Sequence, residues 1–339
     1  MSLSAIHVQQ FTAFEDLQVD FSPGINVFVG GNGVGKTHLL KIGYVACAIT
    51  QTDVAFPKKL LSVFMPSRSD LARLAKGQAE GARWSVTVYR RHAIATVSFE
   101  LGLTGAGSAT TMGRDAWVRP PIQAAYIPVN DVLANAPGFR SLYAHRAVHF
   151  EELYDDILVR AYLPPLRKAA PEDREALDLL EEHMGGTVIV NGEEFFLQHS
   201  EGDLEFSLLA EGIRKLGLLW LLIRNGSLLP GSVLFWDEPE SNLNPQLFGV
   251  VIEVLLGLQR RGVQVFLATH DYVVLKELDL RRTPDDDITF QALYRDEDTK
   301  EIACNPQESY LDISPNAIFE TFDRLYDRDV RRSLEAMEG

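Results

Sequence analysis

The sequence is poor in cysteine, in long apolar runs and in positive charge. Cys47 and Cys304 are the two cysteines among 339 residues, and they stand far apart in no metal-ligand spacing, which argues against a disulfide framework and a zinc site. No apolar run exceeds eight residues, as at 216–223, whereas a membrane-spanning helix needs about 20. Residues 1–10 lack the basic segment and apolar stretch of a signal peptide. We therefore expect a soluble protein of the reducing cytoplasm without a membrane partner.

Acidic side chains outnumber basic ones by 47 to 32, which gives a formal net charge of −15 at pH 7. This balance excludes a protein that coats nucleic acid through bulk positive charge. The charge is uneven, however. Residues 1–50 carry 2 basic and 3 acidic side chains, residues 51–150 carry 12 and 6, and residues 151–339 carry 18 and 38. Only the middle block is electropositive, so a local basic surface is still to be considered there.

Hydrophobic residues make up 46% of the chain, enough to bury a sizeable core in two average domains or one enlarged α/β domain. Apolar periodicity and turn residues predict strands and helices in alternation over much of the chain. Strands are expected within 3–29, at 84–101 as a hairpin, at 122–128, at 187–198 as an Asn-Gly hairpin, and at 232–236, 264–268 and 288–294. Helices are expected at 37–49, 58–76, 211–224, 245–261 and from 316 onward, with mostly helical structure over 141–184 and a loop at 102–113.

A glycine-rich segment between a predicted strand and a predicted helix has the pattern G-x-x-x-x-G-K-[S/T] of a phosphate-binding loop. Its residues are Gly30, Gly31, Asn32, Gly33, Val34, Gly35, Lys36 and Thr37, and His38 follows in the same nucleotide-binding segment. Glycines allow backbone N–H groups to wrap the phosphates of ATP, and the helix N-terminus adds its dipole. Lys36 would place a charge on the phosphates, and Thr37 would offer a hydroxyl to Mg²⁺.

Two further strand ends carry polar side chains suited to nucleotide chemistry. Asp237 and Glu238 follow the apolar run 233–236, and His270 follows the apolar run 265–268. We expect Asp237 to hold Mg²⁺ directly or through water, and Glu238 to act as the general base that polarises the attacking water. Because carboxyl ends of parallel strands meet at one sheet edge, His270 is expected to reach the γ-phosphate as a sensor.

Three segments in this order resemble the ABC-type ATPases, and within them the SMC/RecF/OLD-like branch of AAA-family ATPases rather than transporter subunits. They are INVFVGGNGVGKTHLLK at 25–41, FWDEPESNLNP at 235–245 and LATHD at 267–271. The resemblance implies a two-lobed α/β head with a P-loop NTPase fold, a mixed β lobe, a central parallel sheet and an inserted helical subdomain. It also implies a homodimer in which two heads sandwich two ATP molecules. We assign residues 1–50 and 200–339 to the ATPase core and 51–199 to an inserted basic region.

The resemblance also implies a signature motif before the second acidic strand, and the matching stretch is 209–215. Gly212 is retained there to contact the γ-phosphate of the partner subunit, but Ala210 replaces the usual serine, so hydrolysis is expected to be slower or differently tuned. An ordinary amphipathic helix is the alternative interpretation. Gln123 and Asn130 are both candidates for the glutamine-loop position. Phe11 and Phe14 either flank the adenine or pack in the core.

The predicted insertion holds a run of basic side chains that either forms a solvated face or binds duplex DNA. They are Lys58, Lys59, Arg68, Arg73, Lys76, Arg83, Arg90 and Arg91. Residues 285–339 show no effector motif, which implies a separate effector such as a nuclease or a toxin, in DNA transactions or anti-phage defence. The alternatives are the energising subunit of a membrane transporter and an ATP-dependent scaffold with little turnover.

Overall fold

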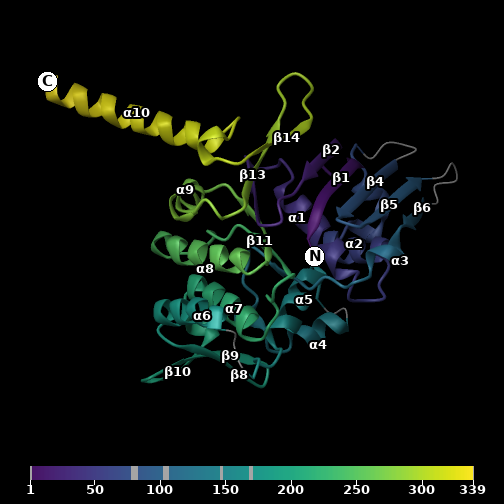
Figure 1. The fold of residues 1–339 in the computed structure, drawn as a ribbon, viewed down its shortest axis with the longest axis horizontal. Helices are drawn as coiled ribbons and strands as arrows, with labels where there is room; N and C mark the ends of the chain where they lie inside the picture. Colours follow the sequence, from purple (N-terminus) through teal and green to yellow (C-terminus); the bar gives the residue numbers. More distant parts are fainter. Residues whose placement is uncertain (1, 78–82, 102–106, 146–147, 168–170, 339) are drawn as a thin grey trace.

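The computed structural model describes residues 2–77, 83–101, 107–145, 148–167 and 171–338, which form two β lobes with helices around them (Figure 1). A six-stranded sheet with the order β14-β13-β3-β12-β11-β7 lies at the centre. A five-stranded sheet with the order β2-β1-β4-β5-β6 forms the N-terminal lobe, and a small sheet with the order β10-β9-β8 lies beside the helices.

The central sheet brings together strands from both ends of the chain. Its strands are β3 (Ile25–Val29), β7 (Ala124–Ile127), β11 (Val233–Asp237), β12 (Gln264–Thr269), β13 (Ile288–Arg295) and β14 (Ile302–Gln307). All neighbours are parallel except β13 and β14. The carboxyl ends of β3, β12, β11 and β7 therefore meet at one edge of the sheet, as the predicted strand-end residues require.

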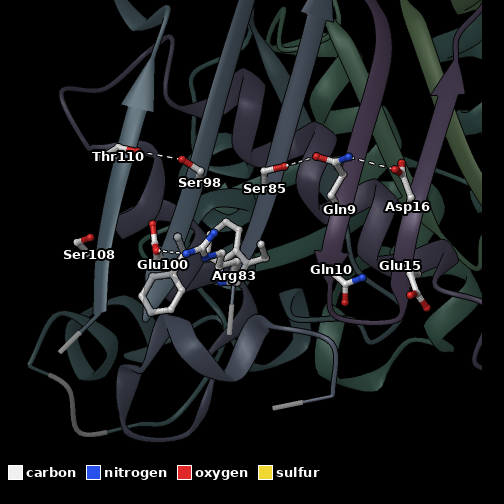
Figure 2. A pocket seen from close by; sticks show the side chains of 12 residues that line it. Gln9, Gln10, Glu15, Asp16, Arg83, Ser85, Ser98, Glu100, Ser108 and Thr110 are labelled. Carbon is white, nitrogen blue, oxygen red and sulfur yellow. Dashed lines mark hydrogen bonds and ion pairs between the residues drawn. The ribbon is translucent and has the colours of Figure 1, made fainter. Parts of the chain in front are cut away.

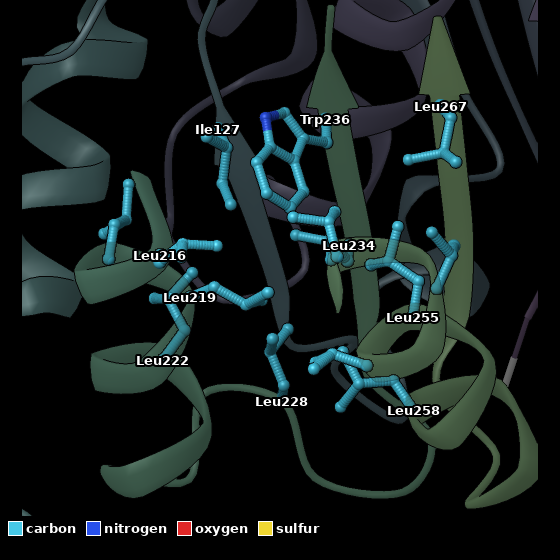
Figure 3. Close-up of a cluster of buried hydrophobic side chains, with 14 of the residues drawn as sticks. Ile127, Leu216, Leu219, Leu222, Leu228, Leu234, Trp236, Leu255, Leu258 and Leu267 are labelled. Carbon is cyan, nitrogen blue, oxygen red and sulfur yellow. The ribbon is translucent and has the colours of Figure 1, made fainter. Parts of the chain in front are cut away.

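Alternate residues of the central strands enter two different cores, one on each face of the sheet. In β3, Val27 and Val29 face the core that includes helices α7 (Glu211–Arg224) and α8 (Phe248–Arg260), whereas Phe28 faces the core that includes α1 (Lys36–Ala48). Figure 3 shows leucines of α7 and α8 packed against β7, β11 and β12. Burial on both faces explains why these strands are apolar throughout.

The N-terminal lobe consists of antiparallel strands whose inner faces pack on α1. They are β1 (Leu3–Phe11), β2 (Phe14–Asp20), β4 (Arg83–Arg90), β5 (Ala93–Leu101) and β6 (Gly107–Met112). The last strand corrects the loop expected at 102–113, although 102–106 lie outside the described residues. Thr110 and Thr111 suit a strand because they are β-branched, and the hydroxyl of Thr110 lies 2.9 Å from that of Ser98 on β5.

The range 51–199 contributes strands to both large sheets. Strand β4 pairs with β1, and β7 pairs with β11, so strands from this range extend both lobes. The division into core and insertion stays a prediction. The remaining elements of this range and its continuation are α2 (Phe56–Phe64), α3 (Arg114–Trp117), α4 (Phe139–Ala144), α5 (Glu152–Ala161), α6 (Pro171–Met184), β8 (Thr187–Asn191), β9 (Glu194–His199) and β10 (Gly202–Glu205).

The helix predicted over 58–76 ends early, at Phe64. Met65 adopts a left-handed conformation with φ 46°, and Pro66 offers no backbone N–H to continue the helix. Short 3₁₀ turns at Ser67–Ser69 and Leu71–Leu74 follow.

The C-terminal part contains α9 (Tyr272–Arg281) and ends in α10 (Ala317–Glu338), which extends away from the rest of the molecule (Figure 1). Over the described residues, no helix combines the length and the apolar character needed to cross a membrane.

The basic side chains of residues 58–91 do not form one solvated surface. Lys59 is buried and pairs with Asp156 at 2.6 Å. Lys76 pairs with Glu15, and Arg83 with Glu100. The other basic side chains of this run that are exposed to solvent are Lys58, Arg68, Arg73 and Arg91.

Arg90, on β4, stabilises the fold from inside. Its guanidinium donates to the backbone carbonyls of Ala116, Arg119 and Pro120 at 2.6–2.9 Å and lies 5.1 Å from the ring centroid of Trp117. A side chain so engaged cannot also contact a DNA phosphate.

Replacing Arg90 by Ala is expected to lower the free energy of unfolding by about 2–4 kcal/mol, because three backbone carbonyls lose a charged donor and the packing on Trp117 is lost. The exposed neighbour provides the matched control, since Arg91→Ala should change stability by less than about 0.5 kcal/mol. Urea denaturation followed by tryptophan fluorescence measures both. Equal stability of the two variants would show that the Arg90 contacts contribute nothing.

Candidate functional site

The glycine-rich loop after β3 forms a tight cradle that only glycines can build at two of its positions. Gly30 has φ 152°, and a Cβ atom there would lie 2.2 Å from the carbonyl oxygen of Leu293. Gly35 has φ 88°, and its Cβ would lie 2.3 Å from the ring of Phe14. The loop therefore backs against β13 on one side and β2 on the other. Its open side faces a cavity.

Lys36 closes the loop from within. Its Nζ donates to the carbonyl oxygens of Gly30 at 2.7 Å and Gly31 at 2.9 Å. Burial lowers the pKa of the ammonium group, while the nearby carboxylates of Glu238 and Asp237 act in the opposite direction. Because these hydrogen bonds of the ammonium group go to uncharged carbonyl oxygens, a phosphate oxygen would be a stronger hydrogen-bond partner for it.

Asp237, the last residue of β11, is held by two hydroxyl groups. Thr37 donates from Oγ1 to Oδ1 at 3.2 Å, and Tyr126 donates from its phenol to Oδ2 at 3.2 Å. The residue is 3% exposed, and burial raises the pKa of its carboxyl group. Thr37 and Asp237 thus meet as predicted although 200 positions separate them. Tyr126 was not predicted, because nothing in a single sequence indicates which strand neighbours β11.

Glu238 and His270 face each other just beyond the sheet edge. His270 Nδ1 lies 3.3 Å from Glu238 Oε1. The backbone N–H of Glu238 donates to the carbonyl of Ala268 at 2.9 Å, and its φ of 49° is unusual for a residue with a side chain. Such strained conformations cluster at functional sites.

A second carboxylate, Glu240, fixes the end of β12. It accepts hydrogen bonds from Thr269 Oγ1 at 2.7 Å and from the backbone N–H of His270 at 3.2 Å. Burial raises the pKa of its carboxyl group. The sequence analysis did not predict this role of Glu240. The available signal was a second glutamate two residues after Glu238, for which no function had been proposed.

The cradle opens into a cavity of about 360 Å³, lined by Ala13, Asn32, Gly33, Gly35, Lys36, Thr37, His38 and Glu238. A neighbouring cavity of about 630 Å³ is lined by Thr12, Ala13, His38, Arg73, Ala75 and Gly77. Ala13 and His38 line both, so the two cavities adjoin. Burial lowers the pKa of His38 to about 4, and its ring is therefore neutral at pH 7.

The segment around Gly212 lies at the start of α7 and packs on the loop after β11. A Cβ atom on Gly212 would lie 3.0 Å from Leu243 Cδ1 and 3.2 Å from the carbonyl oxygen of Asn242. Lys215 donates to the carbonyl of Ser241. Gly212 is not among the residues that line the Lys36 cavity, and its role toward a partner subunit stays a prediction.

The open choices of the sequence can now be compared with positions in the fold. Asn130 follows β7 at the same edge as Asp237, whereas Gln123 precedes β7 and donates to the carbonyl of Gly226 at 3.4 Å. Asn130, and not Gln123, therefore lies at the edge of the sheet where the nucleotide cradle also lies. Phe11 and Phe14 are both fully buried, which favours core packing for each.

Another cavity of about 600 Å³ lies over the outer face of the N-terminal sheet (Figure 2). Its polar side chains satisfy one another across the strands. Gln9 donates to Asp16 and accepts from Ser85, and Arg83 pairs with Glu100 at 2.6 Å. This surface holds none of the residues predicted for the nucleotide site, so the chemistry is assigned to the cradle.

The oxygen atoms of Thr37 and Asp237 fit Mg²⁺, which prefers hard oxygen ligands and usually binds proteins through one or two of them plus substrate phosphates. Among the residues that the structure describes, no group of three or more histidine, cysteine or acidic side chains could hold a metal unaided.

Comparisons with known proteins agree with this geometry. A family model described as "AAA domain, putative AbiEii toxin, Type IV TA system" matches residues 25–276, and one described as "AAA domain" matches residues 5–42. The DNA replication and repair protein RecF of Limosilactobacillus reuteri (strain DSM 20016) is 26% identical over 241 residues, which cover 63% of this chain and 59% of that protein. RecF of Heliobacterium modesticaldum is 54% identical over 41 residues, 12% of this chain and 11% of that protein.

The chain thus spans less than two thirds of these curated relatives. Among solved structures, an SMC head bound to the C-winged helix domain of ScpA aligns with a TM-score of 0.58 and 11% identity, over 91% of this chain and 98% of that one. The SMC head domain from Thermotoga maritima aligns with a TM-score of 0.50 and 16% identity, over 91% of this chain and 100% of that one. These likenesses show the fold, and they confirm the two-lobed ATPase head expected from the sequence.

The half-buried His38 ring predicts a pH dependence of stability. Its pKa is lowered from 6.5 to about 4 in the folded state, so the unfolded chain binds the extra proton between these values. Stability is therefore present above pH 6.5 and is lost as the pH falls toward 4, by about 2 kcal/mol at pH 5. His38→Gln should lack this component, which urea denaturation at pH 7.5 and pH 5 measures. The same loss in both proteins would contradict the assignment of a neutral His38 ring.

Proposed function

Because the chain belongs to this family of AAA domains, as a P-loop ATPase of the SMC/RecF branch, we propose that it binds ATP with Mg²⁺ and hydrolyses it to ADP and phosphate. The observation that carries the proposal is the meeting of Thr37 and Asp237 beside the Lys36 cradle, with Glu238 at its rim. The named residues come from two segments far apart in the sequence and converge at one sheet edge.

In this proposal the backbone N–H groups of residues 30–35 and the ammonium of Lys36 hold the phosphates. Lys36 exchanges the carbonyls of Gly30 and Gly31 for phosphate oxygens. Thr37 and Asp237 hold Mg²⁺, which neutralises charge on the β- and γ-phosphates when it is bound. The adjoining cavity beside His38 and Arg73 has the room for the nucleoside.

Glu238 is proposed as the general base. It accepts a proton from a water molecule whose oxygen bonds to the γ-phosphorus, while the bond from that phosphorus to the bridging oxygen of ADP breaks. His270, 3.3 Å from the Glu238 carboxylate, contacts the γ-phosphate and orients the base. Glu240 keeps His270 in place through its backbone N–H.

The complete site is proposed to form at a head-to-head homodimer, in which Gly212 of one copy closes the cavity of the other. The N-cap position of α7 is Ala210, which makes no side-chain cap hydrogen bond, so this helix end offers backbone N–H groups only. We therefore expect slow turnover. ATP-dependent closure then serves a separate effector such as a nuclease or toxin, in DNA transactions or anti-phage defence. The likeness to a DNA replication and repair protein supports the first of these two settings.

Glu238→Gln should leave ATP binding intact and lower the hydrolysis rate by about 10²–10⁴-fold, because the base is lost while the cradle is kept. Lys36→Ala should instead abolish binding. Nucleotide-binding titration and phosphate release measure the two effects separately. An unchanged hydrolysis rate in the Glu238 variant, or full ATP affinity in the Lys36 variant, would remove the basis of the assignment.

Duplex DNA is proposed as a ligand of the exposed basic side chains outside the cradle. Reversing Lys58, Arg68 and Arg91 to Glu should weaken binding and reduce the slope of log K against log salt by up to about 3, since each lost phosphate contact removes about 0.9. Filter binding of duplex DNA at two salt concentrations measures this slope.

The matched control reverses Arg324, Arg328 and Arg331, which are exposed on α10 and change the net charge by the same amount. The control should bind DNA with the original slope. Equal loss in both triple variants would indicate bulk charge, and no loss in either would exclude Lys58, Arg68 and Arg91 as DNA ligands.

A further inference from the structure

The carboxylate of Asp237 has two hydroxyl partners, and only one of them belongs to the expected nucleotide machinery. Thr37 reaches Oδ1 from the start of α1, and Tyr126 reaches Oδ2 from β7, both at 3.2 Å. The two donors approach from different elements, so together they fix the rotation of the carboxylate about its Cβ–Cγ bond.

Tyr126 is itself held rigidly. It lies in the parallel pairing of β7 with β11, opposite Phe235, and is 2% exposed. Its ring packs edge-on against the ring of Tyr44, with 5.6 Å between centroids. The phenol therefore has little freedom to follow the carboxylate if the carboxylate moves.

Tyr44 also donates its hydroxyl group to a carboxylate, but to a different one. Its hydroxyl donates to Asp156 at 2.7 Å, and the same carboxylate accepts from Lys59 at 2.6 Å. The chain thus contains two neighbouring buried tyrosines that each donate to a carboxylate, and only one of those carboxylates lies at the cradle.

We propose that Tyr126 is a positioning residue that holds the Asp237 carboxylate in the orientation that accepts Mg²⁺; the inference rests on the proposed function. Loss of the phenol leaves Oδ2 buried without a donor, so the carboxylate turns or admits water before it meets the metal. Partners of this kind change metal affinity by about 10–100-fold in other proteins.

Tyr126→Phe removes one oxygen atom and keeps the ring against Tyr44. Binding of fluorescently labelled ATP is measured as a function of Mg²⁺ concentration, and again in EDTA. The variant should need about 10-fold more Mg²⁺ for half-maximal binding, while its ATP affinity in EDTA is unchanged. A purely structural role would lower both affinities together or lower only the melting temperature.

Tyr44→Phe is the matched control, because it removes an equally buried hydroxyl from a carboxylate that lies away from the cradle. It should keep the wild-type Mg²⁺ requirement. A wild-type requirement in Tyr126→Phe, or an equal increase in both variants, would overturn the positioning role. A wild-type protein that binds no ATP at any Mg²⁺ concentration would instead overturn the proposed function. Melting temperatures of both variants confirm that each is folded.

Discussion

The candidate site depends on one buried carboxylate at the end of β11. Asp237 is out of contact with bulk water and has hydroxyl donors instead of a cationic partner at hydrogen-bond distance. A carboxylate in such surroundings is costly unless it is hydrogen-bonded or paired with a cation. The parallel pairing of β7, β11, β12 and β3 imposes this position, because it brings four strand ends to the same edge of the sheet.

The charges around Asp237 explain why nucleotide would bind more tightly together with a metal than without one. Lys36 faces the carboxylates of Glu238, Asp237 and Glu240, so acidic groups prevail at the cradle. ATP alone would add negative charge to an acidic site, and a divalent cation alone would find two protein oxygens. A metal–phosphate complex satisfies both needs. These charges support the proposal that the cradle binds Mg²⁺–ATP more tightly than either component alone.

Much of this arrangement could be predicted from the sequence, because the glycine pattern, the Asp237-Glu238 pair and His270 each follow an apolar strand. The roles of Tyr126 and Glu240 could not be predicted, since both depend on which strands become neighbours. The basic residues at 58–91 were expected to share one exposed face, and this prediction failed because it too depends on which residues become neighbours in the fold. Arg90 and Lys59 are indistinguishable from exposed residues in the sequence, but carbonyls and carboxylates brought near by folding engage both. Strand β6 was hidden because glycine, serine and threonine also characterise loops.

The most direct measurement of the central claim is a crystal structure of the Glu238→Gln protein with ATP and Mg²⁺. The account predicts phosphate oxygens within hydrogen-bond distance of Lys36 Nζ, which will have left the carbonyls of Gly30 and Gly31. It also predicts Mg²⁺ beside Thr37 and Asp237, with Tyr126 still bonded to Asp237. Nucleotide bound elsewhere, with Lys36 still on the loop carbonyls, would contradict the account.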